Sequence, residues 1–565
     1  MRNILLPSTT AEEQNQNTFI GKECEIELHA GDEVFELLAE RSIQSGWDTL
    51  YDLCPWSTVF QSRSFVTTWY QIYGKEYEPI LIKSVEEGKL NGLLTLARNK
   101  KGLIFGAGES QSEYHVWLAT DVNGEIFIRK ALVEIFKRFK GCQILLKYIP
   151  GKAPMKWVKQ DPVLKKRCII RACKQPLMKI DGGYFTSELR KKNRREKINR
   201  LKRKGELKFE RVTDIKAFSS ILEELIIQFD FRKMAMYNTS FFLNDSRRKK
   251  FLVSLFQQDL LHATVLRLNE EIIASNVGAT GNSWVHLQGI NTHSPSYAKY
   301  SPGILHFLML GKLLADEGIA IFDLTPGEDA YKDELATHYD LTHEIRIFGS
   351  WSDHIKSTFF QHFKKVMWGI GIKPATLRKI KKRSIIFREQ IAHAKKDGIL
   401  VLMKSIIKQA GLPEEAREYV AQLDEIIKLP NLLGINKNSL LDLLEIETHQ
   451  TLTTRREFLE NAMHRFEALQ SVYTFCKDGL LLCCVWLSYD NSTTSSIALL
   501  QGFYCHPFGR TLLQSFVVTV AAALTAERKE SHIYAITTSR DKMYGQELEA
   551  IGFKSLVNSP HINKL

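Results

Sequence analysis

The sequence predicts a mixed α+β fold built as tandem modules, each with a central mixed β-sheet flanked by helices, together with a helical linker. Three observations support this prediction. The chain has 565 residues, more than one hydrophobic core usually organises, so about two to four domains are expected. Runs with strand periodicity alternate with amphipathic helix patterns. One order of elements, in which three strands precede a helix, a strand and another helix, occurs twice.

The first module is expected to span residues 1–160. A strand is predicted near residues 25–29, and Glu87 and Gly88 between two apolar runs indicate a hairpin turn. The remaining expected elements are helices over 32–41, 60–73 and 126–139 and the strand QILLKYI. This order predicts an α+β unit of about 150 residues.

The second module is expected over residues 161–350 and contains the recurring order of elements. Its helices are followed by the strands HATVLRL, EIIASNVGAT and SWVHLQGI, a helix, and the strand IAIFDL. The third module is expected over residues 443–565 and repeats this order. Residues 351–442 have an almost wholly helical pattern with many basic residues, which predicts a helical basic linker between these modules.

The composition indicates a soluble globular protein with reduced thiols. Hydrophobic residues make up 44% of the chain and charged residues 25%. No apolar run approaches the roughly 18 residues of a membrane span, and residues 1–20 lack a signal-peptide pattern. The nine cysteines form no CxxC pair, which is typical of thiols in a cytoplasm. We therefore expect a cytoplasmic protein without a transmembrane segment.

Positive charge is concentrated in two stretches. The net charge is +13, yet Arg190 to Lys204 alone holds ten basic residues and one acidic residue, and Lys364 to Arg388 holds nine basic residues and no acidic one. Such runs bind RNA, anionic membrane surfaces or acidic polymers, although many are simply the solvated faces of helices. Contact of Arg190 to Lys204 with RNA or an anionic membrane is therefore one expectation among several.

The start of the helix after Tyr300 has features of an anion site. Ser301 is a good N-cap residue, and Pro302 suits the first helical position because its missing N–H costs nothing there. The amides of Gly303, Ile304 and Leu305 are expected to have no partner within the helix, and a phosphate would fit against them. The alternative is that these residues simply begin a buried helix.

Several motifs resemble one family. They are FQSRSFVTTWYQIYG from Phe60, the pair Glu113 and Tyr114, the basic helix from Arg190, YSPG at Tyr300 and FDLTPGEDAYK at Phe322. Together, over residues 58–348, they resemble GNAT acyltransferases, and among these the CelD/BcsL-like acetyltransferases of bacterial polysaccharide biosynthesis. That branch is similar to the Fem-type peptidyltransferases, which place two GNAT-like units in one chain. The resemblance implies that the modules are GNAT-like.

The resemblance also implies a cofactor site. GNAT proteins bind the pyrophosphate of acyl-CoA in a loop of pattern Gln/Arg-x-x-Gly-x-Gly/Ala, and Tyr300, Gly303 and Leu305 occupy this frame here with the first glycine kept. Acyl-CoA, with acetyl-CoA as the usual donor, is thus the expected cosubstrate, and the alternative from Fem-type proteins is an aminoacyl-tRNA. The expected cofactor-binding residues are Tyr300, Ser301, Gly303, Ile304 and Leu305.

Acyl transfer needs a group that accepts the proton of the nucleophile. The expected catalytic residues are Asp323, Lys332, Tyr331 and His286, and the expected substrate-binding residues are Arg232, Gln288 and Glu328. The alternatives are a surface turn in which Glu328 caps a helix, a packed strand histidine at His286, and an exposed helix end at Arg232. The histidines have no spacing typical of a metal site, so no metal is expected.

These observations lead to one functional hypothesis and two rivals. The hypothesis is an N- or O-acyltransferase that moves an acyl group directly from acyl-CoA to a small-molecule or saccharide acceptor, such as a cell-envelope or polysaccharide precursor. No cysteine or serine is placed as an obvious acylated nucleophile, which favours direct transfer. The rivals are an aminoacyl-tRNA-dependent Fem-like transferase and a non-catalytic GNAT-like scaffold at the membrane surface.

Overall fold

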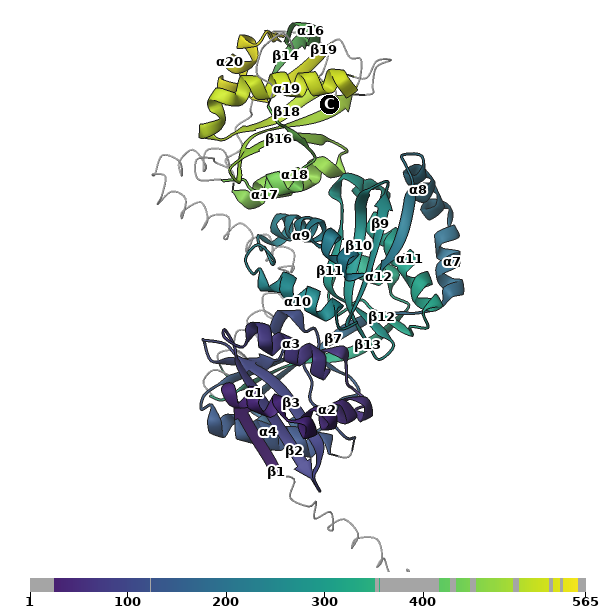
Figure 1. Cartoon of the computed structure of the whole chain (residues 1–565), viewed down its shortest axis with the longest axis vertical. Coiled ribbons are helices and arrows are strands. Elements are labelled where there is room, and N and C mark those ends of the chain that lie inside the picture. Colours follow the sequence, from purple (N-terminus) through teal and green to yellow (C-terminus); the bar gives the residue numbers. More distant parts are fainter. Residues whose placement is uncertain are drawn as a thin grey trace, which may run out of the picture. The chain divides into compact units, whose positions relative to one another are not determined.

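The computed structural model describes most of the chain and divides it into two compact units (Figure 1). The first unit comprises residues 1–177 with 323–362, and the second comprises residues 178–322 with 363–565. The described residues are 25–121, 123–350, 355, 416–426, 433–447, 454–490, 497–527, 532–538 and 542–556.

The first unit is built on a mixed sheet in the order β1-β2-β3-β4-β6-β13-β7. Its strands are β1 (Glu25–Ala30), β2 (Glu78–Glu86), β3 (Lys89–Arg98), β4 (Leu103–Gly106), β6 (Gln143–Pro150), β7 (Cys168–Lys179) and β13 (His338–Phe348), and the short β5 (Leu118–Ala119) pairs with β3. Only β4 and β6 are parallel among the pairs described for these strands. Glu87 and Gly88 form the predicted hairpin turn with positive φ angles of 50° and 76°.

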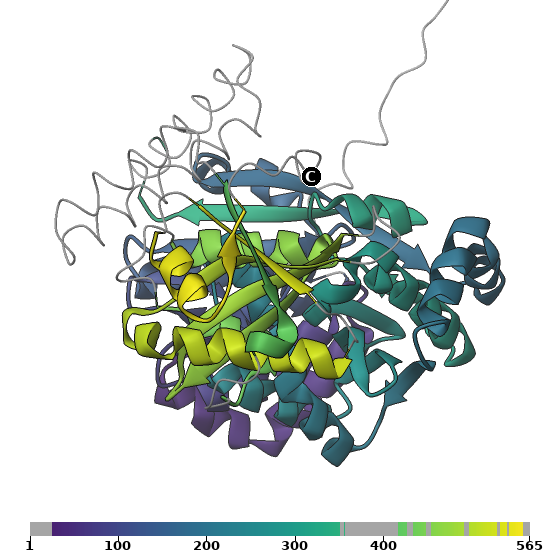
Figure 2. The same cartoon turned by 90° about the horizontal axis from the view of Figure 1, so that it is seen from above.

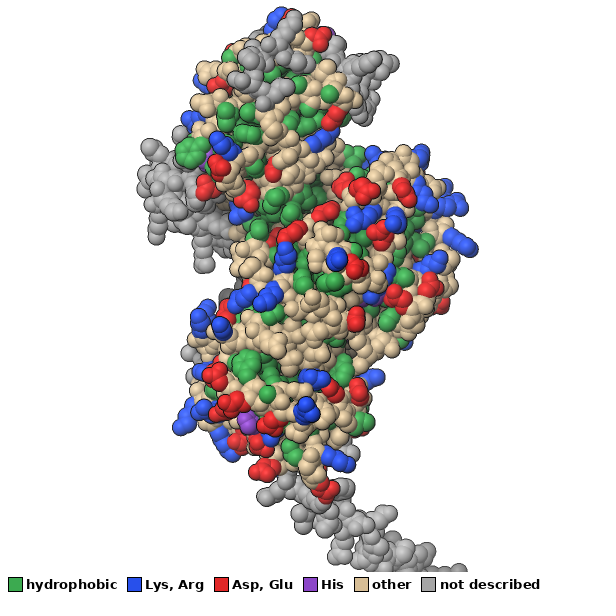
Figure 3. All heavy atoms as spheres, in the orientation of Figure 1, with side chains coloured by type: hydrophobic (Ala, Val, Ile, Leu, Met, Phe, Trp, Pro, Cys, Tyr) green, Lys and Arg blue, Asp and Glu red, His purple; other side chains and the backbone are tan. Residues whose placement is uncertain are grey.

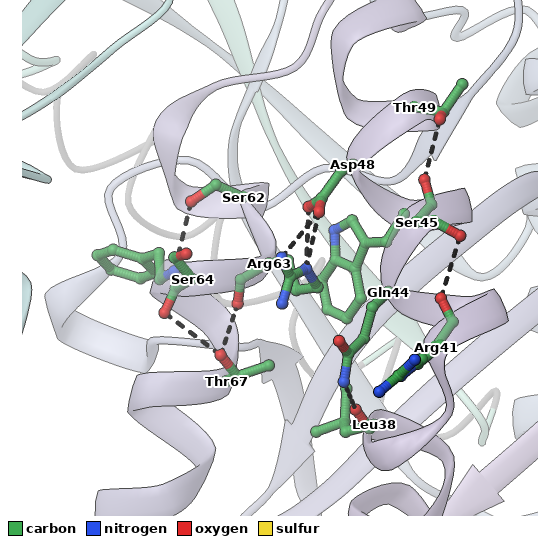
Figure 4. Close-up of polar contacts among 12 residues, drawn as sticks. Leu38, Arg41, Gln44, Ser45, Asp48, Thr49, Ser62, Arg63, Ser64 and Thr67 are labelled. Atoms are coloured by element: carbon green, nitrogen blue, oxygen red, sulfur yellow. Dashed lines mark hydrogen bonds and ion pairs between the residues drawn. The ribbon is translucent and has the colours of Figure 1, made fainter. Parts of the chain in front are cut away.

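Helix α3 of the first unit begins at a side-chain cap, and an ion pair joins it to α2. The helices are α1 (Asp32–Ala39), α2 (Arg41–Leu53), α3 (Arg63–Tyr73), α4 (Gly124–Arg138), α5 (Trp157–Gln160), α6 (Pro162–Lys165) and α12 (Ala330–Leu335). The Ser62 side chain accepts a hydrogen bond from the amide of Phe65, and so caps α3. Arg63 then donates from Nε and Nη2 to the Asp48 carboxylate on α2, at 2.9 and 2.8 Å (Figure 4). This bidentate pair links the start of α3 to α2.

The second unit contains two sheets. In its central part the strands follow the order β12-β11-β10-β9-β8, with α11 packed against β9 and β10 and α9 against β11. The strands are β8 (Leu207–Val212), β9 (Leu261–Leu268), β10 (Glu271–Gly281), β11 (Trp284–His293) and β12 (Ile321–Asp323), and the helices are α7 (Gly182–Arg190), α8 (Lys192–Lys202), α9 (Ile215–Tyr237), α10 (Arg247–Phe256) and α11 (Pro302–Asp316).

The C-terminal part of the second unit has a sheet in the order β15-β16-β17-β18-β19-β14-β20. Its elements are β14 (Ala416–Gln422), α16 (Leu423–Ile426), β15 (Asn436–Lys437), α17 (Leu440–Leu444), α18 (Arg455–Glu467), β16 (Ser471–Lys477), β17 (Leu480–Asp490), β18 (Ile497–Cys505), α19 (Leu513–Glu527), β19 (His532–Thr538), α20 (Lys542–Ala550) and β20 (Lys554–Ser555). Helix α19 lies across the strands and contributes Phe516, Val520 and Leu524 to the core (Figure 2).

The predicted fold class is confirmed: the chain is a mixed α/β protein with large mixed sheets flanked by helices. The recurring order is present as β9, β10, β11, α11, β12, α12 and again as β16, β17, β18, α19, β19, α20. The prediction of an almost wholly helical segment over 351–442 is wrong for Ala416–Gln422, which forms β14 by antiparallel pairing with β19. Most of that segment lies outside the described residues.

One helix of the described part of the chain, residues 507–527, is long and apolar enough to cross a membrane by length and composition. Half of its apolar window is buried within the protein, where Phe516, Val517 and Val520 pack in the hydrophobic core. A core helix has the same composition, so this observation is weak evidence for a membrane span.

A single carboxylate holds the segment after α9. Asp230 has no exposed surface and accepts hydrogen bonds from the Ser240 hydroxyl and from the amides of Phe241, Phe242 and Leu243, at 2.8 to 3.0 Å for the best of each. The carboxylate thus accepts from three consecutive main-chain amides and fixes the backbone of this segment through charge-assisted hydrogen bonds.

We expect Asp230→Ala to lower the free energy of unfolding by about 3 kcal/mol, because the Ser240 hydroxyl and three main-chain amides lose their common acceptor and a cavity replaces a buried side chain. Urea titration followed by circular dichroism measures the change. Glu223→Ala, which removes an exposed ion pair with Lys249, is the control and is expected to cost less than about 1 kcal/mol. Equal losses for both variants would contradict this role of Asp230.

Candidate active site

A polar cluster in the first unit brings together residues that are far apart in the sequence. Glu113 and Tyr114 follow the short turn Glu109–Gln111, Gln175 lies on β7, Asp323 ends β12, and Lys332 lies on α12. Four of the five side chains are buried, and Glu113 is partly exposed. The cluster therefore combines several ionisable groups with access to solvent through one of them.

Asp323 is the centre of this cluster. Its side chain has no exposed surface, and each carboxylate oxygen accepts a hydrogen bond. The Tyr114 hydroxyl donates to Oδ2 at 2.5 Å, and the Thr325 amide donates to Oδ1 at 2.9 Å. The Gln175 amide nitrogen in turn donates to the Tyr114 hydroxyl at 2.8 Å. These bonds define the orientation of a buried carboxylate. Burial, together with the nearby Asp323 charge, raises the pKa of Tyr114 well above its ordinary value.

The turn after Asp323 also positions Lys332. Thr325 has a positive φ of 58°, an uncommon conformation for a β-branched residue. Its carbonyl oxygen accepts a hydrogen bond from Lys332 Nζ at 3.1 Å, and Asp329 Oδ2 lies 3.8 Å from the same nitrogen. Lys332 is 5% exposed, and burial lowers its pKa although Asp329, Glu113 and Asp323 act in the opposite direction. The amine is thus held beside the carboxyl groups in a poorly solvated place.

Glu113 has the chemical properties of a general base. Burial, together with the negative charge of Asp323, raises its pKa to about 7, although Lys332 and Lys147 act to lower it. A carboxyl group with a pKa near neutrality exchanges protons readily at physiological pH. One carboxylate in this cluster is therefore fixed by donors, while the other is poised to take and release a proton.

The sequence predicted part of this cluster. Asp323 and Lys332 were expected in it, and Tyr331 and Glu328 lie beside Lys332, the first partly exposed on α12 and the second exposed in the preceding turn. Glu113 and Gln175 were missed as site residues. The pair Glu113 and Tyr114 carried the family resemblance, but no spacing connects it to Asp323 in the sequence.

The start of α11, in the second unit, differs from the expected anion site. Ser301 is the N-cap residue, but its φ is 52° and its side chain makes no capping bond. Its carbonyl oxygen accepts hydrogen bonds from the amides of Ile304 and Leu305 at 3.1 and 3.2 Å. The prediction that these two amides have no partner within the helix is therefore wrong, because the first turn closes on the Ser301 carbonyl.

The five predicted cofactor-binding residues have different environments. Tyr300 and Leu305 pack in a hydrophobic cluster with Leu201 and Leu266, so their side chains serve the core. Ser301, Gly303 and Ile304 are partly exposed. A Cβ at Gly303 would lie 3.5 Å from His293 Nδ1, which is an ordinary van der Waals contact. A Cβ atom would therefore fit here without a clash.

Two cations lie beside the first turn of α11. Lys197 Nζ, on α8, donates to Ser301 Oγ at 2.8 Å. The Arg232 guanidinium, on α9, donates to His293 Nδ1 at 3.1 Å. Burial and the Arg232 charge lower the pKa of His293 to about 3, so this histidine is neutral at physiological pH and accepts the bond. The positive end of the α11 dipole and the charges of Lys197 and Arg232 therefore all contribute positive potential at the first turn of α11.

The remaining predicted residues lie on β11. His286 is 2% exposed, and its ring stacks with that of Trp284 at 5.9 Å between centroids. Gln288 is partly exposed on the same strand. In the part of the chain that the structure describes, no group of three or more histidine, cysteine, aspartate or glutamate side chains could hold a metal ion.

One segment of the chain matches the model of a known protein family. Residues 188–333 match the acetyltransferase (GNAT) domain. The matched segment runs from the end of α7 to α12 and covers about a quarter of the chain. The matched segment contains α11 together with Asp323 and Lys332. A comparison with curated proteins finds no match.

Solved structures with similarity to the chain include the following three proteins. The C-terminal domain of a putative lysylphosphatidylglycerol synthetase from Agrobacterium fabrum is 11% identical, covers 56% of this chain and 94% of its own, and has a TM-score of 0.38. FemX is 10% identical, with 54% and 95% coverage and a TM-score of 0.38. L-PGS from Bacillus licheniformis is 11% identical, with 56% and 95% coverage and a TM-score of 0.37. These TM-scores are too low to support a conclusion about fold or function.

The raised pKa of Glu113 predicts a pH-dependent stability. Below its ordinary pKa of 4.5 Glu113 is protonated in both the folded and the unfolded chain. As the pH rises towards 7 the unfolded chain loses this proton first, so the free energy of unfolding falls relative to that of Glu113→Gln. We expect a relative loss of about 2 kcal/mol, reduced from the full value because Glu113 keeps some solvent contact.

Denaturant titrations of both proteins between pH 4 and pH 8 measure this difference. Glu36→Gln, which removes an exposed glutamate of α1, is the control for the loss of one charge. A wild-type to Glu113→Gln difference that stays constant over this interval would show that the carboxyl group is not held in its neutral form.

Proposed function

We propose that this chain is an acyltransferase in which Glu113 accepts the proton of the attacking acceptor. The observation that carries the proposal is a partly exposed carboxyl group with a pKa of about 7 beside the buried Asp323 and Lys332. The match of residues 188–333 to a GNAT acetyltransferase domain supports acyl transfer as the reaction class. Proton transfer alone would fit many reactions, so the two observations support the proposal together.

The proposed step is a direct transfer. The nitrogen or oxygen of the acceptor attacks the donor carbonyl while the Glu113 carboxylate takes the proton from that atom. The C–S bond of the donor then breaks, and the departing thiolate takes a proton from solvent. Asp323 raises the proton affinity of Glu113, and its bonds with Tyr114 and Thr325 keep it in place. Lys332 limits the repulsion between the two carboxyl groups. His286 and Tyr331 stay candidates for contact with the reacting groups.

We further propose acyl-CoA as the donor and the start of α11 as the place that binds its diphosphate. Lys197, Arg232 and the dipole of α11 supply the positive potential that such a group needs. Ser301, Gly303 and Ile304 are the partly exposed residues of this turn. The proposed acceptor is a saccharide or another cell-envelope precursor, contacted by Gln288 and Glu328, and the proposed compartment is the cytoplasm. The acceptor class depends on the family resemblance.

The experiment is a measurement of thioester consumption with acetyl-CoA and a panel of amino sugars. We expect Glu113→Gln to lower kcat/KM by about 100-fold or more, because it removes the base without a large change in shape. The wild-type rate should rise with pH and level off above about 7, as Glu113 becomes ionised. Asp323→Asn should lower kcat and shift the midpoint of this pH profile downwards, because it removes the charge that raises the pKa of Glu113.

Glu36→Gln is the control for this series, since Glu36 is exposed on α1. Unchanged turnover in both Glu113→Gln and Asp323→Asn would remove the catalytic assignment. An inactive wild-type protein that also retains no CoA on purification would favour the non-catalytic scaffold.

A second candidate function is favoured by the basic surface of α7 and α8. Figure 3 shows Lys and Arg side chains gathered over the edge of the central part where Figure 1 places these helices. Within α8, Leu201 is the buried residue, so most of this helix is solvated. The exposed cations are Arg190, Lys191, Lys192, Arg195, Arg200, Lys202, Arg203 and Lys204. Such a surface suits the phosphates of RNA, as an aminoacyl-tRNA-dependent transferase requires.

We test this candidate by RNA binding at increasing salt. If α8 contacts the RNA backbone, the logarithm of the affinity should fall steeply with the logarithm of the salt concentration. The triple variant Arg195→Gln, Arg200→Gln and Lys202→Gln should flatten this slope by about 2. The matched control replaces three exposed lysines of the first unit, namely Lys89, Lys101 and Lys140. A flat salt response of the wild type, or equal effects of both triple variants, would count against RNA as the partner.

A further inference from the structure

Two buried thiols face each other in the C-terminal sheet. Cys483 on β17 and Cys505 on β18 are directly opposed in the antiparallel register, and their sulfur atoms are 3.8 Å apart. Cys484, the next residue on β17, belongs to a different hydrophobic cluster from that of Cys483 and Cys505. Successive strand residues point to opposite faces, so Cys483 and Cys505 form a pair that excludes Cys484.

The backbone around this pair already suits a disulfide. Directly opposed residues of an antiparallel pair have Cα atoms about 4.5 or 5.5 Å apart, depending on their place in the ladder. Both values fall within the range of about 4.4 to 6.8 Å found for disulfides. Rotation of the two side chains is therefore enough to bring the sulfur atoms to bonding distance, and the strands keep their register. We propose that Cys483 and Cys505 form a reversible cross-strand disulfide when the protein meets a hydroperoxide.

The two thiols are not equivalent. The Cys483 thiol donates to Cys505 Sγ, and this hydrogen bond, with the charge of Arg510, lowers the pKa of Cys505. Cys505 is 9% exposed, whereas Cys483 has no exposed surface. Cys505 thus has both more thiolate character and better access to a small oxidant, and Cys483 lies in place as the resolving thiol.

The reaction balances with hydrogen peroxide as the oxidant. The Cys505 thiolate attacks one peroxide oxygen, the O–O bond breaks, and water leaves with one proton from solvent, which gives a sulfenic acid. Cys483 sulfur then attacks Cys505 sulfur, the S–O bond breaks, and the departing hydroxide takes the Cys483 proton as a second water. Two thiols are oxidised and one peroxide is reduced to two waters.

The disulfide would alter the turn that leads into α19. In the reduced protein the Cys505 thiol donates to the His506 carbonyl at 3.4 Å, and Cys483 Sγ lies 3.8 Å from the Gly509 carbonyl oxygen. Oxidation removes both thiol protons, so the His506 carbonyl group loses its donor. The His506 amide still donates to the Leu482 carbonyl at 2.8 Å and keeps the end of β18 in place. We therefore expect a local change in residues 506–512 with the sheet retained.

Peptide mapping of the full chain tests the proposal without any variant. The purified protein is treated with hydrogen peroxide, quenched with an alkylating reagent under denaturing conditions, and digested. The expected result is a peptide pair linked through Cys483 and Cys505, the loss of these two thiols from the alkylated peptides, and full recovery of both by dithiothreitol. Amide hydrogen exchange should become faster in residues 506–512 and stay unchanged in β17.

Two variants complete the test. Cys505→Ser should abolish the linked peptide and leave all eight remaining thiols free, whereas Cys173→Ser, a change at a partly exposed thiol of β7, should leave the linkage intact. Hydrogen exchange of the untreated Cys505→Ser protein verifies that it is folded. Oxidation of Cys505 beyond sulfenic acid without linkage, or a linkage that uses Cys484 as readily as Cys483, would overturn the proposal.

Discussion

The buried charge of Asp323 is the constraint on which the arrangement of the candidate active site depends. A carboxylate without solvent contact is costly unless donors surround it, and here the donors are the Tyr114 hydroxyl and the Thr325 amide. Burial is the main cause of the raised pKa of Glu113, and the charge of Asp323 raises this pKa as well. One buried charge therefore organises both the structure of the cluster and its proton chemistry.

The two repeats of the same strand and helix order carry different side chains at corresponding places. After β11 the turn into α11 lies beside Lys197 and beside His293, which Arg232 contacts. After β18 the turn into α19 lies over two thiols and contains His506. An equal order of elements does not imply equal chemistry, because function depends on the side chains that the fold presents. The turn into α11 is the place proposed for binding a diphosphate, and the turn into α19 is the place proposed for a redox-sensitive modification.

Much of the fold could be predicted because its helices and strands have strong local patterns. The hairpin at Glu87 and Gly88 and the helix after Ser301 were found from turn and capping residues. Strand β14 was missed because residues 416–422 gain their extended structure by pairing with β19, a partner that local sequence does not reveal. The first turn of α11 was predicted with free amides, but the left-handed conformation of Ser301 directs its carbonyl to two of them. A serine without a β-branch gives no sequence signal of that conformation.

The sequence by itself determined the mixed α/β class, the repeated order of elements, the concentration of charge in the basic helix, and Asp323 and Lys332 as candidates, because each of these depends on local periodicity or composition. The tertiary structure alone decided that Glu113, Tyr114 and Gln175 join Asp323, and that Cys483 faces Cys505. Such pairs lie on different strands and turns, so their meeting is set by the order and register of the sheets. The chemistry of both sites depends on these contacts, since the pKa of Glu113 and the pairing of Cys483 with Cys505 are set by residues that are distant in sequence and close in space.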